Sequence, residues 1–387
     1  MAGAGPITAL VLGGGVGGLV AAHRLRKKLP SGQRVVLVER EARHVFAPSL
    51  LWVMTGDRSA DAISRPLARL ERKGIEVVHG EIEAIDPVGR SARVNGITLS
   101  AEFLVVALGA DFVPEVIPGL AEAGSTFCTL AGALAVREAV DRFTGGRLVL
   151  LTAAPAYKCP AAPYEAAMLL DSHLRRRGVR ERTEIALYAA EPGPMGVAGP
   201  EVSAGVREMV ESKGIRYYPG HQVKTADAVT RGLTFENGAE APYDLLIHVP
   251  PLRAPGAVRS AGLAPDAGWI GVDRHTLATG FERVFAVGDV TSIPLKLGKP
   301  LPKAGVFAHA QAEVVARNIS REVTGRGAPA AFDGHGECFV ETGGGRAGFG
   351  SGEFYAEPLP QVSLHRPAWR WHAGKVLLEK SWLWRWF

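Results

Sequence analysis

Three cysteines, Cys128, Cys159 and Cys338, are the residues of this chain best suited to redox or nucleophilic chemistry. Two thiols that lie together can store a pair of electrons by forming a disulfide, and an ionised thiol is a good nucleophile. Cys159 lies in the turn 153–160, directly after the apolar run 148–152, which predicts a buried strand. Any one cysteine taken alone is more often a small buried apolar residue. The place of Cys159 in a turn directly after a strand nevertheless indicates a sulfur enzyme.

No CxxC pair or histidine cluster predicts a metal site, and three cysteines do not make a disulfide framework in a chain without an export signal. The N-terminus has no leader of basic, apolar and cleavage regions, so we expect an intracellular protein.

A glycine-rich turn near the N-terminus predicts a dinucleotide site. The sequence Gly13-Gly14-Gly15-Val16-Gly17-Gly18 follows an apolar strand and precedes a predicted helix. Gly13 and Gly15 let backbone N–H groups approach a pyrophosphate, and Gly18 lets the helix pack on the strand. Glu39 ends the next predicted strand, where it can bind an adenosine ribose. A single glycine pattern would be a weak signal among 47 glycines, but the flanking strands and the acid strengthen it.

Alternating strands and helices predict an α/β protein with two Rossmann-like domains and an interleaved chain. The expected strands are 9–12, 34–38, 103–108, 148–152, 184–188, 215–218, 245–249 and 283–287, and the expected helices are 19–29, 163–177, 202–213 and 306–323. We expect a meander within 75–108. The first domain then spans 1–145 and 266–325, the second spans 146–265, and a C-terminal region follows over 326–387.

The second domain lacks the glycine-rich turn that a nicotinamide coenzyme needs. Its turn 153–160 carries side chains and prolines, which keep the backbone away from a pyrophosphate. We therefore expect electrons to arrive from a donor other than NAD(P)H.

Five of the seven tryptophans lie in the last 19 residues, and 366–387 contributes +4 of the net charge of +5. No run of about 18 to 20 apolar residues could span a bilayer. A basic, tryptophan-rich, amphipathic tail suits the surface of a membrane. The alternative is a tail that packs on the core or on another subunit. Nucleic-acid binding is not expected, because no recognition motif or basic stripe occurs elsewhere.

The first domain, with Gly109 after a strand and with Gly288-Asp289 and Lys303 before a helix, resembles the two-dinucleotide-binding-domain flavoproteins of the disulfide reductase superfamily. That resemblance implies FAD in the first domain. Asp289 would bind a sugar or the ribityl chain, and Lys303 with the positive end of the following helix would stabilise the reduced flavin.

Over nearly the whole chain the sequence is similar to the sulfide:quinone oxidoreductases, with the flavocytochrome c sulfide dehydrogenases as relatives. The segments that carry this resemblance are Phe46-Ala47-Pro48-Ser49-Leu50-Leu51-Trp52 with Gly56, Cys128-Thr129, Cys159-Pro160 with Tyr164-Glu165, Pro302-Lys303-Ala304-Gly305, 338–343 and 375–382. The resemblance places Pro48 and Ser49 in a flavin-side loop.

By this resemblance Cys159 and Cys338 are the redox pair beside the flavin, and Cys128 is an accessory thiol. Hydrosulfide would attack the disulfide between Cys159 and Cys338 and leave a persulfide on one of them. A second sulfide would remove the outer sulfur as polysulfide, and the electrons would pass to FAD. Glu165 is a candidate proton acceptor, or simply an acid favoured at a helix N-terminus. Phe339 and Trp382 are candidates for binding the quinone, although core packing explains either of them equally well.

The chain departs from the family where histidines are expected, after Cys128 and near Met195, which puts proton handling and the substrate in doubt. We expect a peripheral enzyme on the cytoplasmic side of the cell membrane that takes electrons from sulfide to a membrane quinone; self-association is left open. The alternatives are a sulfide dehydrogenase with a cytochrome acceptor, a type II NADH dehydrogenase, and a flavoprotein that senses persulfide without turnover.

Overall fold

The first sheet of this computed structural model, which describes residues 5–264 and 268–387, is mixed: apolar parallel strands form most of it, and an antiparallel meander forms one side. Its strand order is β5-β2-β1-β8-β7-β6, and β19 pairs with β8. All six residues of β1 are buried because helices cover one face of the sheet and other strands flank it. The strands are β1 (Ile7–Leu12), β2 (Arg34–Glu39), β5 (Glu76–His79), β6 (Ile82–Asp86), β7 (Ser91–Val94), β8 (Ile97–Val106) and β19 (Val284–Ala286).

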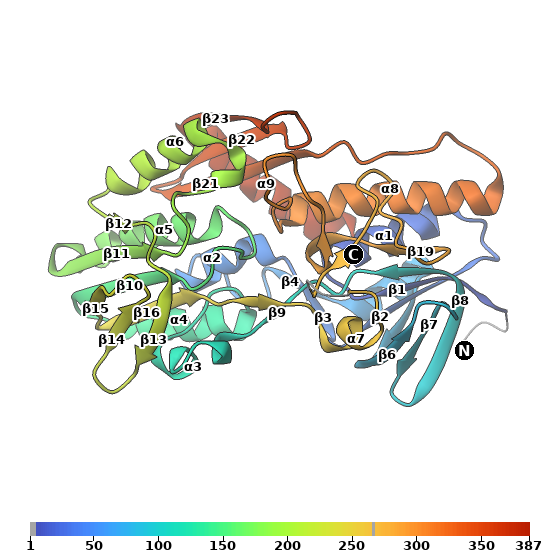
Figure 1. Ribbon diagram of the computed structural model, residues 1–387, viewed down its shortest axis with the longest axis horizontal. Helices are drawn as coiled ribbons and strands as arrows, with labels where there is room; N and C mark the ends of the chain where they lie inside the picture. Colours follow the sequence, from blue (N-terminus) through green and yellow to red (C-terminus); the bar gives the residue numbers. More distant parts are fainter. Residues whose placement is uncertain (1–4, 265–267) are drawn as a thin grey trace.

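Helices α1 (Val16–Lys28) and α8 (Gly305–Thr324) lie side by side over this sheet (Figure 1). Their close approach depends on glycine, since a Cβ on Gly17 would lie 3.0 Å from the Val287 side chain and 3.7 Å from Ala308. Because α8 belongs to a segment nearly 300 residues later than α1, the chain leaves the first domain and returns to it.

The second domain has an all-parallel sheet in the order β12-β11-β10-β16. Its elements are β10 (Gly146–Thr152), α5 (Ala162–Arg176), β11 (Thr183–Ala189), α6 (Pro200–Glu211), β12 (Arg216–Tyr218), the small antiparallel sheet β13 (Val223–Asp227), β14 (Gly232–Phe235) and β15 (Glu240–Pro242), and β16 (Leu245–Val249). Helix α4 (Leu130–Arg142) precedes β10. The two Rossmann-like domains appear as the two lobes of Figure 1.

The C-terminal region joins the two lobes. It consists of the antiparallel sheet β21 (His335–Gly343), β22 (Arg346–Glu353) and β23 (Gln361–Ala368), followed by α9 (Trp369–Arg385). Helix α9 starts beside β22 and ends against α1, where the ring of Trp386 meets that of His23 (Figure 1). Within the described residues, no helix combines the length and the apolar character needed to cross a bilayer.

The predicted strands and helices all form, and most of them begin and end within two residues of the expected positions. The exceptions are β8, which begins six residues before the expected 103, and α1, which begins three residues before the expected 19. One difference is that residues 76–79 do not join the meander: β5 pairs in parallel with β2, and only β6, β7 and β8 form antiparallel pairs. The predicted boundary between the second domain and the returning first domain, at 265 and 266, lies outside the described residues.

Candidate active site

Cys159 and Cys338 are brought together from different domains. Cys159 lies between β10 and α5 in the left-handed region, with φ of +56°. Its N–H donates to the Lys303 carbonyl at 2.7 Å, and its carbonyl accepts from Ala162 N–H at 2.9 Å. These bonds hold a non-glycine residue in a conformation that costs energy. Cys338, on β21, packs against the same core cluster and is close enough to Cys159 for each thiol to shift the pKa of the other, while its own Sγ donates to the Phe339 carbonyl oxygen at 3.2 Å.

The three thiols have different environments. Interaction with the Cys338 thiol lowers the pKa of Cys159, and the same interaction together with burial raises the pKa of Cys338. Burial raises the pKa of Cys128 to about 12, although it lies close enough to Lys158 and Cys159 to interact with their charges. The pKa directions therefore favour Cys159 as the thiol that ionises first.

A buried ion pair lies beside the two cysteines. Lys375 of α9 donates to Glu165 of α5 at 2.7 Å, and the same carboxylate oxygen accepts from the N–H of Glu341 at 2.9 Å. The Glu341 carboxylate in turn lies 3.0 Å from Nδ1 of His372. Burial raises the pKa of Glu341. Glu165 is thus fixed by a cation from the C-terminal helix, a partner that the sequence did not reveal.

Replacing Lys375 with methionine should lower the free energy of unfolding by about 3–5 kcal/mol, because Glu165 would be left as an unpaired buried charge. Urea denaturation followed by circular dichroism measures this effect. The matched control is Lys380→Met on the same helix, where the ammonium group is exposed and its pair with Glu379 contributes about 0–1 kcal/mol. The Glu379 carboxylate keeps Ser49 and Arg58 as partners in this variant. Equal losses of unfolding free energy in the two variants would show that the pair of Lys375 and Glu165 contributes no more than the pair of Lys380 and Glu379.

The glycine turn forms a cradle that fits a dinucleotide. Gly13 has φ of +102°, and a Cβ there would lie 2.5 Å from the Ala107 carbonyl oxygen. A Cβ on Gly18 would lie 1.7 Å from the oxygen of Gly13, whereas one on Gly15 would meet nothing within 4 Å. Gly15 precedes α1 without a side-chain cap, so the N–H groups at this helix start face open space. An anion such as a pyrophosphate fits here.

The other predicted flavin-side residues lie around this cradle in different ways. Glu39 accepts from Gly14 N–H at 2.5 Å, and Gly109 has φ of +67° after β8. Pro48 is exposed. Ser49 is buried and donates to the Glu379 carboxylate of α9 at 2.6 Å, so its hydroxyl is already engaged by the C-terminal helix.

Gly288, Asp289 and Lys303 line one narrow pocket at the start of α8. Lys303 donates from Nζ to the carbonyls of Asp289 and Thr291, at 2.5 and 3.0 Å. Burial lowers its pKa to about 8. Lys158, next to Cys159, lies 3.1 Å from the Asp289 carboxylate, so this pocket and the cysteine loop share a border.

In the second domain, hydrogen-bonded side chains fill the place where a coenzyme would lie. Glu191 follows β11, the position of a ribose-binding acid in a Rossmann fold. Its carboxylate accepts from Thr152, Tyr157 and Tyr164 at 2.7, 2.6 and 2.5 Å, and all four side chains are buried. Burial raises the pKa of both tyrosines. The sequence showed that the turn 153–160 lacks glycines, but it did not predict this cluster of hydrogen-bonded side chains.

The two predicted quinone residues are not together. Phe339 lies against Gly374 on α9, where a Cβ would meet its ring at 3.1 Å. Trp382 is eight residues further along the helix, a rise of about 12 Å. It is only 6% exposed and donates to Nε2 of His44 at 3.1 Å. His44, whose Nδ1 lies 2.9 Å from the Gly14 carbonyl oxygen, was not predicted and carries no motif.

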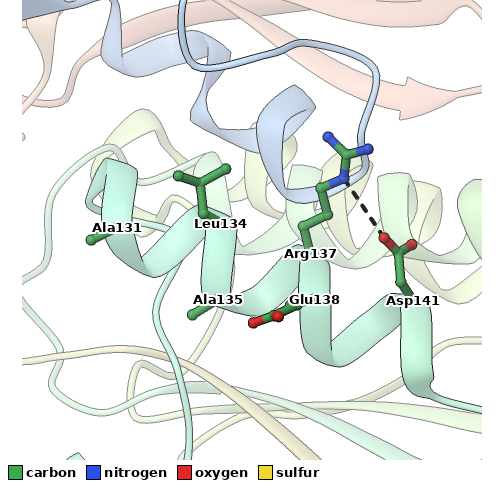
Figure 2. A pocket seen from close by; sticks show the side chains of 6 residues that line it. All are labelled: Ala131, Leu134, Ala135, Arg137, Glu138 and Asp141. Atoms are coloured by element: carbon green, nitrogen blue, oxygen red, sulfur yellow. Dashed lines mark ion pairs between the residues drawn. The ribbon is translucent and has the colours of Figure 1, made fainter.

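An open hollow also lies on the surface of α4. Figure 2 shows its lining, which comes from this helix alone and includes the ion pair between Arg137 and Asp141. None of the cysteines or flavin-side residues lines it, so we do not assign it to the site.

Comparisons with known proteins agree with this geometry. The model of the family described as pyridine nucleotide-disulphide oxidoreductase matches residues 8–312. The sulfide-quinone reductase of Aquifex aeolicus is 28% identical over 97% of this chain and 90% of its own length. The mitochondrial sulfide:quinone oxidoreductase of Mus musculus is 24% identical over 90% of this chain and 79% of its own length.

Among solved structures, the crystal structure of the sulfide:quinone oxidoreductase from Aquifex aeolicus has a TM-score of 0.89 and 26% identity, covering 98% of this chain and 91% of that one. These likenesses confirm the resemblance predicted from the sequence motifs.

Proposed function

The chain is a flavoprotein oxidoreductase of the pyridine nucleotide-disulphide oxidoreductase family, and we propose that it oxidises sulfide through Cys159 and Cys338 and passes the electrons to a membrane quinone. The observation that carries this proposal is the contact between two thiols from distant parts of the chain, beside the flavin-side residues Asp289 and Lys303.

The directions of the pKa shifts of the two thiols predict which cysteine sulfur hydrosulfide attacks. Hydrosulfide attacks the sulfur of Cys338 in the oxidised pair, because Cys159 has the lower pKa and leaves faster. The sulfur–sulfur bond between the cysteines breaks, Cys338 becomes a persulfide, and Cys159 is released as a thiolate. A second hydrosulfide then removes the outer sulfur as disulfide ion, HSS⁻, and leaves Cys338 as a thiol.

The cofactor we propose is FAD. Its pyrophosphate would lie against Gly13, Gly15 and Gly18, and a ribose hydroxyl would bind to Glu39. The remaining part of the molecule would lie beside Asp289, Lys303 and the start of α8. The loop with Pro48, Ser49 and Gly109 would border it. Bound there, the flavin supplies a two-electron acceptor that allows the cysteine pair to return to the disulfide. Glu165, held by Lys375, would take up protons beside the pair.

The nicotinamide alternative is disfavoured by the filled site in the second domain. A coenzyme there would have to displace the bonds of Glu191 to Thr152, Tyr157 and Tyr164, and leave these buried groups unsatisfied. Sulfide is therefore the better candidate for the electron donor.

For the acceptor, we propose that quinone reaches the protein from a membrane surface bound by α9. Trp369, Leu377 and Trp384 are 72%, 69% and 83% exposed. They share one face of the helix with Arg370, Lys380 and Arg385, while Lys375, Glu379 and Trp382 lie on the buried face. Apolar and basic groups on one exposed face suit the headgroup layer of a membrane containing anionic lipid. Phe339, beside Cys338 and against α9, is the quinone-binding candidate.

Anaerobic mixing of the purified protein with sulfide should bleach the flavin absorbance, and added decylubiquinone should restore it. NADH in place of sulfide should leave the absorbance unchanged, because the second domain has no room for its pyrophosphate. Stopped-flow spectroscopy near 450 nm measures all three reactions. Bleaching by NADH but not by sulfide would favour a type II NADH dehydrogenase. Bleaching by sulfide without reoxidation by quinone would favour a cytochrome acceptor or a sensor.

A further inference from the structure

The C-terminal helix reaches the glycine turn through one buried histidine. His44 lies on β3 (Arg43–Val45), with only 3% of its surface exposed. Its Nδ1 lies 2.9 Å from the Gly14 carbonyl oxygen, and its Nε2 lies 3.1 Å from Nε1 of Trp382. Because a carbonyl oxygen can only accept and the indole N–H can only donate, His44 must be neutral with its proton on Nδ1. Burial lowers its pKa to about 4, which agrees with this assignment.

This bond fixes the orientation of one peptide plane in the turn. In a trans peptide the C=O of Gly14 and the N–H of Gly15 point in opposite directions. With the oxygen held by His44, the Gly15 N–H points away from the histidine. A Cβ on Gly15 would meet nothing within 4 Å, so one flank of this residue is open. Because glycine has few steric barriers to rotation of its peptide groups, the orientation of this peptide depends on a hydrogen bond from another residue, here His44.

Other contacts keep Trp382 in place. Its ring packs on Phe46 and His309, at centroid distances of 5.7 and 5.6 Å. One turn later Trp386 packs edge-on against His23 at 4.9 Å, with Arg24 over its ring. On the same buried face, Glu379 accepts from Ser49 and pairs with Arg58 at 3.0 Å. The indole that holds His44 thus packs directly on α8, and Trp386 anchors the same end of the C-terminal helix to α1.

We propose that Trp382 and His44 are positioning residues for the dinucleotide. Trp382 orients the imidazole, the imidazole orients the Gly14–Gly15 peptide, and the Gly15 N–H is thereby aimed at the pyrophosphate. The C-terminal helix is then part of the cofactor site, although it touches no cofactor. This assignment depends on a dinucleotide in the first domain and is independent of sulfide and quinone.

The test is the rate at which FAD leaves the protein, measured in a Cys128→Ser background so that Cys128 cannot retain the cofactor covalently. Purified holoprotein is diluted, and the fluorescence of released flavin is followed. His44→Leu should release FAD about tenfold faster, because the carbonyl loses its donor. Trp382→Phe, which keeps an aromatic ring but lacks the N–H, should release it about threefold faster. His44→Asn should stay near the wild-type rate, because its amide can donate to the same oxygen.

Trp384→Phe, an exposed tryptophan on the same helix, is the matched control and should leave the rate unchanged. A thermal melt of each holoprotein separates positioning from packing. Faster release from His44→Leu and Trp382→Phe with rescue by His44→Asn supports the proposal. Unchanged release from Trp382→Phe, or equally fast release from His44→Asn and His44→Leu, overturns it. Since Trp382→Phe conserves the packing, the test stands even if His44→Leu does not fold.

Discussion

Cys159→Ser protein will retain its flavin spectrum when sulfide is added anaerobically, with flavin reduction slowed by roughly a thousandfold or more. Serine cannot form the disulfide that hydrosulfide attacks, and its hydroxyl cannot replace a thiolate as leaving group. Cys338→Ser should have a similar effect. In the proposed mechanism the two cysteines act as a unit, so the double variant should be no slower than either single one. Stopped-flow absorbance at several sulfide concentrations gives the rate constants.

Cys128→Ser is the matched control for this experiment. Cys128 is half-buried and close enough to Cys159 to interact with its charge, but desolvation raises its pKa to about 12, which makes it a poor nucleophile. Its replacement should leave flavin reduction within about tenfold of the wild-type rate, a loss far smaller than that of a nucleophile. Bleaching of Cys159→Ser at an undiminished rate would rule out the cysteine pair as the route of electrons.

The triple variant Trp369→Ser, Leu377→Ser, Trp384→Ser should lose binding to anionic vesicles by roughly 100-fold or more. Each of these exposed side chains would contribute about 1.5–3 kcal/mol when buried in the membrane. Cosedimentation with vesicles containing phosphatidylglycerol measures binding, and added salt should weaken it because Arg370, Lys380 and Arg385 lie on the same face. Flavin reduction by sulfide should be unaffected, while reduction of membrane quinone should fall.

Val88 and Val229, which are exposed on other surfaces, provide a control pair. Their replacement by serine should leave vesicle binding unchanged. Point substitutions are preferable to removal of the helix, because α9 also carries Trp382, Leu383 and Trp386 in the core. Undiminished vesicle binding by the triple variant would contradict the proposal that the exposed face of α9 binds the membrane.

Local patterns in the sequence were sufficient to predict the two Rossmann-like domains, although not the pairing of β5 with β2 or the C-terminal sheet β21–β23. The glycine turn, the apolar strands and the helix after Lys303 each depend on residues that are neighbours in the chain, so their spacing predicts the element directly. The same is true of the missing glycines in the turn that contains Cys159. The uneven distribution of tryptophan also indicated that the tail is amphipathic, since the helical repeat separates Trp369 and Trp384 from Trp382 and Trp386.

The relationships between distant segments appeared only in three dimensions. His44 has no motif, and its role follows from Gly14 on one side and, on the other, from Trp382, which lies 338 residues after His44 in the chain. The same holds for Lys375 with Glu165, and for Glu191 with Thr152 and Tyr157. The sequence by itself determined the two Rossmann-like domains and the three candidate thiols. Only the tertiary structure decided which thiol ionises first and what orients the glycine turn, because a pKa and a peptide orientation depend on burial and on partners that folding alone brings into contact.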